Sequence, residues 1–325
     1  MAIKHIGYET ANSYVKVKTA TGTDTYLNTL KEIHSTHKEN IIGGDLKAPA
    51  KDRYRVGGRN YFIGEPDGRG STDRGENRYK NVLYLDASKI ALAKQLQNGD
   101  EVVAVTALPS AHYDLPGVHD DLKQEMRKEH TVYKNGVPIT YNVVKFDVIL
   151  QPVATVLPGI FTINGEIHDR ELLNAKKIII DIGWGSTDVA IMNGIELEQN
   201  IPIKASMMDA YNYILNSLEL ANSHVSLFTI EAQLRQGDVF SYGGKKYDCE
   251  ELKKEAMQVT ASKILSEIGE KGVDLREYDF SIFGGGGTLA LREHLKPHLE
   301  GVNAFKIDNP QIQNAVGCYI KSIVL

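Results

Sequence analysis

The sequence predicts an α/β protein built from two similar domains, each with a smaller subdomain. Its 325 residues are about twice the length of a usual single domain. The same pattern of strand, polar turn, strand, turn and strand opens each half, over residues 3–30 and again over residues 177–203. The two copies lie about 175 residues apart, which excludes the short period of a solenoid array. We therefore expect two domains of one design that face each other.

Composition narrows the class of protein. Apolar residues make up 42% of the chain and charged residues 24%, which is ordinary for a soluble globular protein. The net charge of −5 argues against a basic nucleic-acid binder, so any contact with DNA would be local or pass through a partner. Cys249 and Cys318 lack the spacing of a metal site or a disulfide framework, which predicts buried thiols and a cytoplasmic protein. No window approaches the roughly eighteen apolar residues of a membrane span, and residues 1–7 lack a signal-peptide core.

Apolar runs and turn residues predict the elements of each half in order. In the first half we expect strands over 14–19, 24–30, 101–107 and 141–150, a helix over 115–128, a hairpin at Asn135-Gly136, and a short helix or turn over 157–161. Residues 51–81, rich in Gly, Arg, Asp and Asn, are expected to form a solvent-facing subdomain with a long loop. In the second half we expect strands over 178–180, 188–192, 195–203 and 281–283, and helices over 207–221, 248–269 and 288–298. Asn193-Gly194 predicts a tight hairpin turn with positive φ at both positions.

The first motif that carries chemistry is the turn over residues 181–188, which follows an apolar strand. Asp181 ends the strand, and the glycines after it let the backbone turn so that its N–H groups point at phosphate oxygens. Ser186 and Thr187 add hydroxyl donors. Because a carboxylate repels phosphate, the use expected of Asp181 is to hold Mg²⁺ through water. The alternative is a plain Asp/Gly hairpin turn.

Two further motifs support a phosphate site. The run Gly284-Gly285-Gly286-Gly287-Thr288 joins a buried strand to a helix, so a ligand could lie against bare backbone at a helix N-terminus. A flexible connector is the alternative, and the position of the run about a hundred residues after the first turn favours the ligand site. In the first half, Glu9 ends a strand, a small polar turn follows, and Lys16 comes seven residues later. This stretch alone indicates a surface turn, but beside the second half it is the matching phosphate loop.

These motifs, in this order, resemble those of the actin, heat-shock-chaperone and sugar-kinase superfamily, and within it the ParM-like actins that segregate bacterial plasmids. Residues 105–109, followed by Tyr113, are similar to the "GLP" stretch of that group. Residues 146–154 are similar to its first connecting segment, and residues 313–317 to its second. The resemblance covers nearly the whole chain and implies two actin-like (ribonuclease-H-like) domains that flank a nucleotide cleft.

The resemblance also implies domain limits. Domain I would comprise 1–156 plus 309–325, with a smaller subdomain at about 31–95. Domain II would comprise 157–308, with a smaller subdomain at about 205–272.

The resemblance assigns roles to single residues. Gln151 would orient the attacking water, whereas Asp181 and Glu9 would be the catalytic acids that hold Mg²⁺, through water, in the two phosphate loops. Lys16 would reach the β- and γ-phosphates, and the glycine run would bind adenosine. Small residues at Ala315 and Gly317 would let the connecting helices cross closely at a hinge. The implied nucleotide-binding set is Ala11, Asn12, Ser13, Tyr14, Lys16, Gly183, Trp184, Gly185, Ser186, Thr187, Asp188, Gly284, Gly285, Gly286, Gly287 and Thr288.

Several residues depart from the pattern of the family. Glu9 is one methylene longer than the usual Asp, Ala11 replaces a common Gly, and Asn12-Ser13 replaces a Ser/Gly loop. Trp184 puts a bulky ring inside a phosphate loop, where it either stacks on a neighbouring subdomain or narrows the cleft. These departures indicate a divergent member that keeps its activity.

The implied function is that of an ATPase, with ATP (or GTP) and Mg²⁺ as cofactors, that polymerises into filaments. It would segregate plasmid DNA through an adaptor protein bound to a plasmid centromere, with no direct contact to DNA or membrane. The alternative is a small-metabolite kinase of the same fold, for which Asp114, Asp120 and Asp121 are candidate bases, although none stands at a strand end. A scaffold ATPase at a membrane would carry an amphipathic anchoring helix, and the sequence shows none.

One segment is predicted to take part in assembly. Residues 64–80 are hydrophilic and glycine-rich, so they cannot form a core of their own. We expect this loop to make a longitudinal subunit contact in which Arg69, Arg74 and Arg78 pair with acids of the next subunit. The alternative is a surface loop with no role.

Overall fold

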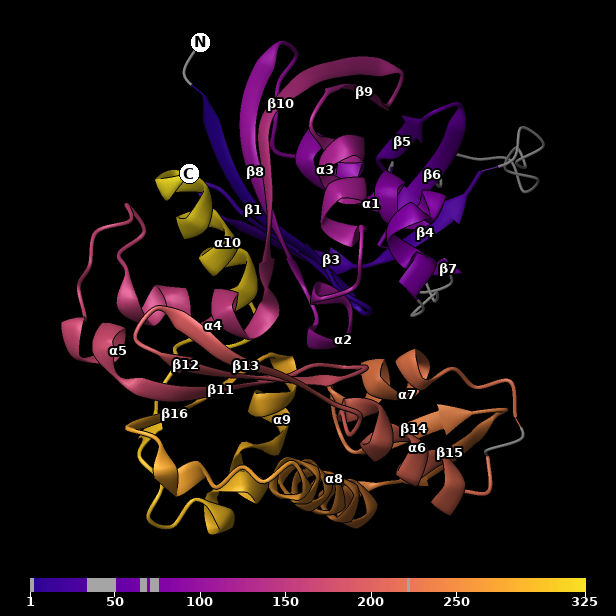
Figure 1. The fold of residues 1–325 in the computed structure, drawn as a ribbon. Helices are drawn as coiled ribbons and strands as arrows, with labels where there is room; N and C mark the ends of the chain where they lie inside the picture. Colours follow the sequence, from indigo (N-terminus) through magenta and orange to yellow (C-terminus); the bar gives the residue numbers. More distant parts are fainter. Residues whose placement is uncertain (1–2, 34–50, 65–68, 71–75, 221–222) are drawn as a thin grey trace. The chain divides into compact units, whose positions relative to one another are not determined.

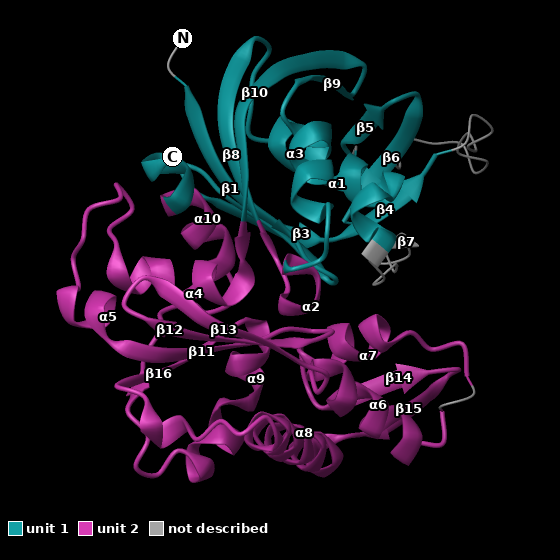
Figure 2. Cartoon of the chain, in the orientation of Figure 1, with its two compact units in different colours: residues 1–106, 114–148, 321–325 teal, residues 107–113, 149–320 magenta. Residues whose placement is uncertain are grey.

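The computed structural model describes residues 3–33, 51–64, 69–70, 76–220 and 223–325, and the chain divides into two compact units (Figure 2). Unit 1 comprises Met1–Thr106, Asp114–Val148 and Lys321–Leu325, and unit 2 comprises Ala107–Tyr113 and Ile149–Ile320. Each unit combines a mixed sheet with helices, so the predicted α/β class is confirmed. The domain limits inferred from the resemblance differ from these units mainly at the two connecting helices and remain a prediction.

Unit 1 is built on a sheet with the strand order β3-β2-β1-β8-β10-β9-β5-β6-β4-β7 (Figure 1). β1 pairs antiparallel with β2 and parallel with β8. The strands are β1 (Lys4–Thr10), β2 (Tyr14–Lys18), β3 (Thr23–Leu27), β4 (Thr29–Glu32), β5 (Arg53–Val56), β6 (Arg59–Ile63), β7 (Arg69–Gly70), β8 (Asp100–Leu108), β9 (Glu129–Lys134) and β10 (Val137–Leu150). Its helices are the 3-10 helix Glu76–Lys80, α1 (Val82–Ala93) and α3 (Val118–Met126).

The region predicted to be a solvent-facing subdomain with a long loop contains buried residues among those that the structure describes. β5 and β6 form a hairpin inside the sheet, and their residues Tyr54 and Tyr61 are fully buried. Arg78 and Tyr79 of the following 3-10 helix are also buried. Apolar tyrosine rings interleaved with the charged residues supply this packing, which the polar composition of the segment concealed. The predicted contact role is therefore wrong for Arg78, while Arg74 and the side chain of Arg69 lie outside the described residues.

Unit 2 is built on a five-stranded sheet with the order β13-β12-β11-β16-β17. β11 pairs antiparallel with β12 and parallel with β16, which repeats the pairing of β1 with β2 and β8 in unit 1. The predicted repeat is thus confirmed as a repeat of sheet topology. The strands are β11 (Lys176–Ile182), β12 (Thr187–Asn193), β13 (Glu196–Ile203), β16 (Phe280–Gly284) and β17 (Ala304–Phe305), and a separate hairpin is formed by β14 (Val239–Tyr242) and β15 (Lys245–Asp248).

Helices cover both faces of the unit 2 sheet because the side chains of a strand alternate between its faces. Ile178, Ile180 and Ile182 of β11 pack in one cluster with α6, α7, α8 and α9, whereas Ile179 packs in a second cluster with α4 and α5. The helices are α2 (Ser110–Tyr113), α4 (Gln151–Ile160), α5 (Arg170–Asn174), α6 (Met207–Ser217), α7 (Leu227–Leu234), α8 (Glu250–Glu270), α9 (Gly286–Leu295) and α10 (Gln313–Val324), of which the end of α10 belongs to unit 1.

The first turns of α10 pack tightly against α4. A Cβ atom added to Gly317 would lie 1.8 Å from the carbonyl oxygen of Ala154, so only glycine permits this approach. Ala315 is buried on the same helix. The expectation that small residues let the connecting helices cross closely is confirmed at Gly317.

Local details differ from the sequence prediction at two places. Asn193 pairs with Glu196, and positive φ occurs at Gly194 alone, so the turn is centred one residue later than predicted. The hairpin at Asn135-Gly136 does have positive φ at both residues. The helix expected as a short turn over 157–161 begins at Gln151, because Pro152 is compatible with a first helical turn that needs no N–H from it.

Candidate functional site

The strongest candidate site grows from the first hairpin of each unit. In unit 1, Glu9 is the register partner of Lys16, and the two form a buried ion pair of 2.7 Å. In unit 2, Asp181 is the register partner of Asp188. The seven-residue spacing of each pair therefore corresponds to one geometry, two facing residues next to the turn of an antiparallel hairpin.

Asp181 is held by side chains from two helices. Thr155 Oγ1 of α4 lies 3.1 Å from Asp181 Oδ2, and Nδ2 of Asn314, in α10, donates to the same oxygen at 2.7 Å. Thr155 Oγ1 also lies 2.5 Å from Asn314 Oδ1. Donors around a carboxylate favour its ionised form. Asp181 is only 3% exposed, so these contacts fix the direction of its carboxylate at the end of β11.

Asp188 is in a different electrostatic position. Burial, and then the negative charge of Asp181, raise the pKa of Asp188 to about 7. One of its oxygens accepts the backbone N–H of Ser110 at 2.7 Å, and the other accepts the hydroxyl of Ser186 at 3.3 Å. The amide of Asn200 donates to the carbonyl of Ser110, so Asp188 and β13 together anchor the start of α2.

The turn between β11 and β12 is tight and held by its own backbone. Gly183 N–H donates to the carbonyl of Ser186 at 2.9 Å, and a Cβ at Gly183 would lie 2.7 Å from that oxygen. The hydroxyl of Thr187 donates to the carbonyl of Ala205, so it serves the fold inside the protein. Gly185 lies between them, and the side chain of Trp184 packs against α7. Trp184 therefore stacks on a neighbouring element, which was one of the two expected outcomes.

Most of the glycine run after β16 is required by packing. Cβ atoms at Gly284, Gly285 and Gly287 would lie 2.3 Å from Thr155, 2.3 Å from Asp181 and 2.5 Å from Ile182 respectively. At Gly286 the nearest atom would be 3.8 Å away. The hydroxyl of Thr288 donates to the carbonyl of Gly284 in the first turn of α9. Gly285 thus lies against Asp181, whereas a Cβ at Gly286 would make only an ordinary van der Waals contact.

Gly286 opens on a cavity of about 480 Å³ inside unit 2. The cavity combines apolar walls with both signs of charge, and it is lined by Tyr211, Leu234, Arg235, Asp238, Glu250, Lys253, Lys254, Met257, Gly286, Leu289, Ala290 and His294. A volume of this size suits a ligand as large as a nucleoside. Since Gly285 touches Asp181, the acid of the turn and the cavity are joined by two consecutive residues.

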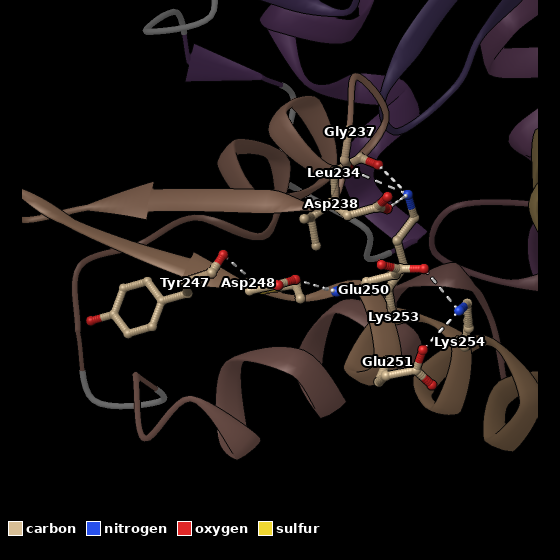
Figure 3. Close-up of polar contacts among 10 residues, drawn as sticks. Leu234, Gly237, Asp238, Tyr247, Asp248, Glu250, Glu251, Lys253 and Lys254 are labelled. Carbon is tan, nitrogen blue, oxygen red and sulfur yellow. Dashed lines mark hydrogen bonds and ion pairs between the residues drawn. The ribbon is translucent and has the colours of Figure 1, made fainter.

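One wall of the cavity is ordered by a lysine (Figure 3). Lys253 Nζ of α8 donates to the carbonyl of Leu234 at 2.7 Å and to that of Gly237 at 3.3 Å, and it pairs with Asp238 at 2.9 Å. Lysine near the C-terminus of α7 satisfies carbonyls that the helix leaves unpaired. Lys254 pairs with Glu250 and Glu251 beside it, so its charge is compensated by carboxylates.

In unit 1, the matching turn is held by a buried arginine. Arg78 donates to the side-chain oxygen of Asn12 at 2.8 Å and to the carbonyl of Thr10 at 3.0 Å. Ala11 N–H donates to the carbonyl of Tyr14, the residue that begins β2, and Asn28 N–H donates to the carbonyl of Ser13. The polar turn is thus shaped by its backbone and by one long-range cation.

Gln151 is the first residue of α4 and lies one turn before Thr155 on the same helix face. Because Thr155 contacts Asp181, that face of α4 is directed at the acid of the turn. Among the described residues, no group of three or more acidic, histidine or cysteine side chains forms a cage for a metal.

Sequence reasoning missed several residues of this region. Asn314 lies within the second connecting segment and Thr155 directly follows the first, yet only Gln151 of the first segment and the small residues of the second had been singled out. The cavity residues come from four helices and the loop after α7, between Tyr211 and His294, without a motif of fixed spacing. Among the helices of the described ranges, none combines the length and apolarity needed to cross a membrane.

Comparisons with known structures agree on the fold. The chain superposes on the crystal structure of apo ParM from pSK41 with a TM-score of 0.75 at 16% identity, covering 100% of this chain and 98% of the other. A structure of an archaeal actin homologue in complex with ADP gives 0.74 at 17% identity, with 98% of both chains covered. A 15-stranded ParM filament from Clostridium botulinum gives 0.76 at 18% identity, covering 100% and 99%.

Sequence comparisons give the family. No curated protein matches the chain. A family model described as the N-terminal domain of actin-like proteins matches residues 12–153, and a model described as the C-terminal domain of archaeal MreB-like actin homologues matches residues 179–297. Because the two models describe successive parts of one kind of protein and together match most of the chain, this protein belongs to the family of actin-like proteins.

Proposed function

We propose that this protein is an actin-like ATPase that binds ATP and Mg²⁺, hydrolyses the γ-phosphate and assembles into nucleotide-dependent filaments. The observation that carries the proposal is the continuity of two features in unit 2. Asp181, oriented by Thr155 and Asn314, touches Gly285, and the next residue opens on the cavity of 480 Å³. A nucleotide needs this combination, because its base and ribose require a partly apolar cavity while its phosphates require a polar turn.

Different residues of the site would bind different parts of the nucleotide. The cavity would take the base and ribose, and backbone N–H groups at Gly183–Thr187 and at the start of α9 would face phosphate oxygens. Gln151 would orient the attacking water, because it lies on the face of α4 that Thr155 directs at Asp181. When bound, Mg²⁺ would neutralise charge on the phosphate oxygens, and Asp181 would hold its water shell.

We assign Glu9, Ala11–Tyr14 and Lys16 of unit 1 to the phosphates as well, on the strength of the repeated hairpin. The buried ion pair with Glu9 keeps the ammonium of Lys16 near the turn. Glu9 would contribute to the Mg²⁺ shell together with Asp181.

We further propose that the filament moves plasmid DNA in the cytoplasm through an adaptor protein that binds a plasmid centromere. Support comes from the ParM fold, including a ParM structure that is itself a filament. A small-metabolite kinase is not favoured, because the similar structures are actin homologues and ParM proteins.

The proposal is tested by phosphate release and nucleotide binding in the wild type and two matched variants. Asp181→Ala should lower the rate of ATP hydrolysis by at least about a hundredfold, equal to about 2.7 kcal/mol of barrier. Asp274→Ala, the same change at an exposed aspartate far along the chain, should leave the rate unchanged. Near-normal phosphate release from folded Asp181→Ala would contradict the assigned role.

Assembly is tested by light scattering with ATP, with GTP and without nucleotide. The proposal expects scattering that rises on addition of nucleotide and falls as phosphate is released. Hydrolysis without any rise in scattering, across protein concentrations and salt, would contradict the filament and leave a monomeric ATPase. The comparison of ATP with GTP also gives the base preference of the cavity.

A further inference from the structure

Trp184, the single tryptophan of the chain, stands inside the phosphate turn but is directed at a helix. Its ring stacks on Phe228 of α7 with a centroid separation of 4.2 Å and an interplanar angle of 8°. Its side chain is 9% exposed, so the ring is a buried contact of the fold. Such a stacked aromatic pair stabilises the contact beyond the apolar area that it buries.

Glu231 lies three residues after Phe228 and therefore on the same side of α7, toward Trp184. Burial raises the pKa of Glu231, and the charge of Arg235 opposes the rise. Arg235 lies 3.5 Å from Glu231 at the end of the helix. The stack on Phe228 is thus the contact that holds Trp184 to α7.

The backbone of the turn has a different anchor. The carbonyls of Gly183 and Trp184 accept the N–H groups of Met207 and Met208, at 3.3 and 3.0 Å, in the first turn of α6. Ser206 and Asp209 complete a capping box at that helix end. The main chain of the turn is therefore fixed to α6, whereas the side chain of Trp184 reports the position of α7.

The other end of α7 forms a wall of the cavity. Leu234 and Arg235 end the helix and line the cavity, and Asp238 lines it three residues later. Lys253 ties this end together through the carbonyl of Leu234 and the carboxylate of Asp238 (Figure 3). α7 has eight residues, a length of about 12 Å, so one short rigid element contacts the phosphate turn at its start and the cavity at its end.

We infer that Trp184 is a positioning residue that couples the cavity to the phosphate turn through α7. This inference rests on the proposed nucleotide site and adds a route by which its two halves communicate. A nucleoside in the cavity contacts the end of α7, and the Trp184–Phe228 stack passes the resulting shift to the turn. Because such coupling is reciprocal, phosphates at the turn also stabilise α7 in the position that it takes when a nucleoside occupies the cavity.

The test uses adenosine, which can occupy the cavity but carries no phosphate. Because Trp184 is the single tryptophan, its fluorescence reports the stack without labelling. In the wild type, adenosine alone should change the tryptophan emission, and ADP should change it further. In Phe228→Ala, adenosine should bind but leave the emission unchanged. Binding is measured independently, by calorimetry or by displacement of a fluorescent ADP analogue.

Measurements of kcat distinguish a positioning role of the Trp184–Phe228 stack from a general loss of structure. Phe228→Ala should lower kcat for ATP by about tenfold, equal to about 1.4 kcal/mol, while the affinity for ADP stays within about threefold, which is about 0.7 kcal/mol. Phe228→Tyr keeps the ring and should restore kcat. Leu227→Ala, a half-buried neighbour on α7 that packs on the cluster around α6 and α8, is the matched control and should leave kcat near that of the wild type.

The outcomes separate this inference from the proposed function. Absence of ADP binding to the wild type would overturn the proposed function and the inference with it. Binding of ADP and adenosine with an unchanged emission, or equal loss of kcat in Phe228→Ala and Leu227→Ala, would overturn the inference alone.

Discussion

Replacement of glycine by alanine should have opposite effects at two helical glycines, Gly269 in α8 and Gly317, where α10 contacts α4. At Gly269 in α8, an added Cβ would meet no atom within 4 Å. Gly269→Ala should therefore stabilise the protein by about 0.5–1 kcal/mol, because alanine loses less backbone entropy in a helix. At Gly317, the Cβ would lie 1.8 Å from Ala154 O and 2.6 Å from its carbonyl carbon. These are backbone atoms, which cannot turn aside as the end of a side chain can.

The size of the second effect follows from the displacement that it forces. To bring the Cβ of Gly317→Ala to about 3 Å from the oxygen, the helices must separate by about 1.2 Å. Overpacking of this kind costs about 1–3 kcal/mol, and the helical gain of alanine offsets about 1 kcal/mol of it. The separation also strains the 2.7 Å hydrogen bond from Asn314, on the same helix, to Asp181. The two terms leave a net loss of about 0–2 kcal/mol, and we expect a value in the upper half of that range together with weaker ATP binding.

Urea unfolding followed by circular dichroism measures both variants against the wild type. The urea concentration at the midpoint of unfolding should be highest for Gly269→Ala, intermediate for the wild type and lowest for Gly317→Ala. A Gly317→Ala protein as stable as Gly269→Ala, with unchanged ATP affinity, would refute the reasoning that this crossing requires a bare backbone.

Three further predictions concern single residues. Gln151→Ala should bind ATP normally, hydrolyse it slowly and give filaments that persist, because only the transition state needs the aligned water; lost affinity at unchanged turnover would contradict this. Burial lowers the pKa of Lys177 to about 8, so the folded state loses this proton at a lower pH than the unfolded state does. In urea titrations between pH 7.5 and 9.5, the free energy of unfolding of the wild type should therefore rise by about 2 kcal/mol relative to that of Lys177→Met. A difference between the two proteins that stays constant over this pH range would be contrary evidence. Arg78→Lys should weaken ATP binding several-fold at little cost in stability, because the compact ammonium lacks the spread guanidinium that reaches Asn12 through one nitrogen and Thr10 through another. Calorimetry that shows unchanged affinity would argue against a role for this turn.

The sequence was sufficient to predict the structure where a motif lay within a single pair of strands. The spacing of seven between Glu9 and Lys16, and between Asp181 and Asp188, is the spacing of register partners across a short hairpin, so the structure could be anticipated from the pattern. The close crossing at Gly317 was likewise visible as a small residue in a connecting segment.

Sequence was insufficient where distant segments meet. The cavity draws its walls from α6, α7, α8, α9 and the loop after α7, and no single spacing encodes that assembly. Arg78 stood in a polar, glycine-rich stretch that indicated solvent, yet its guanidinium is buried over Tyr84, at 5.1 Å from the ring centroid, and bonds a turn more than sixty residues earlier. Charge alone could not reveal this, because the partners are backbone and aromatic groups elsewhere in the chain.

The repeated hairpin also shows how a duplicated element acquires two chemistries. In unit 1 the facing pair is Glu9 and Lys16, so its charges cancel at 2.7 Å and the turn tolerates an approaching anion. In unit 2 both positions are acids, and burial with the charge of Asp181 raises the pKa of Asp188 to about 7. Near neutral pH Asp188 is therefore protonated more readily than an ordinary aspartate, which lowers the mean negative charge of the pair, while Thr155 and Asn314 contact Asp181. A single fixed negative charge beside a phosphate turn can attract a cation without repelling phosphates as strongly as two would. Under the proposed function, the identity of one residue in each pair would therefore set how much charge each hairpin presents to phosphate and to Mg²⁺.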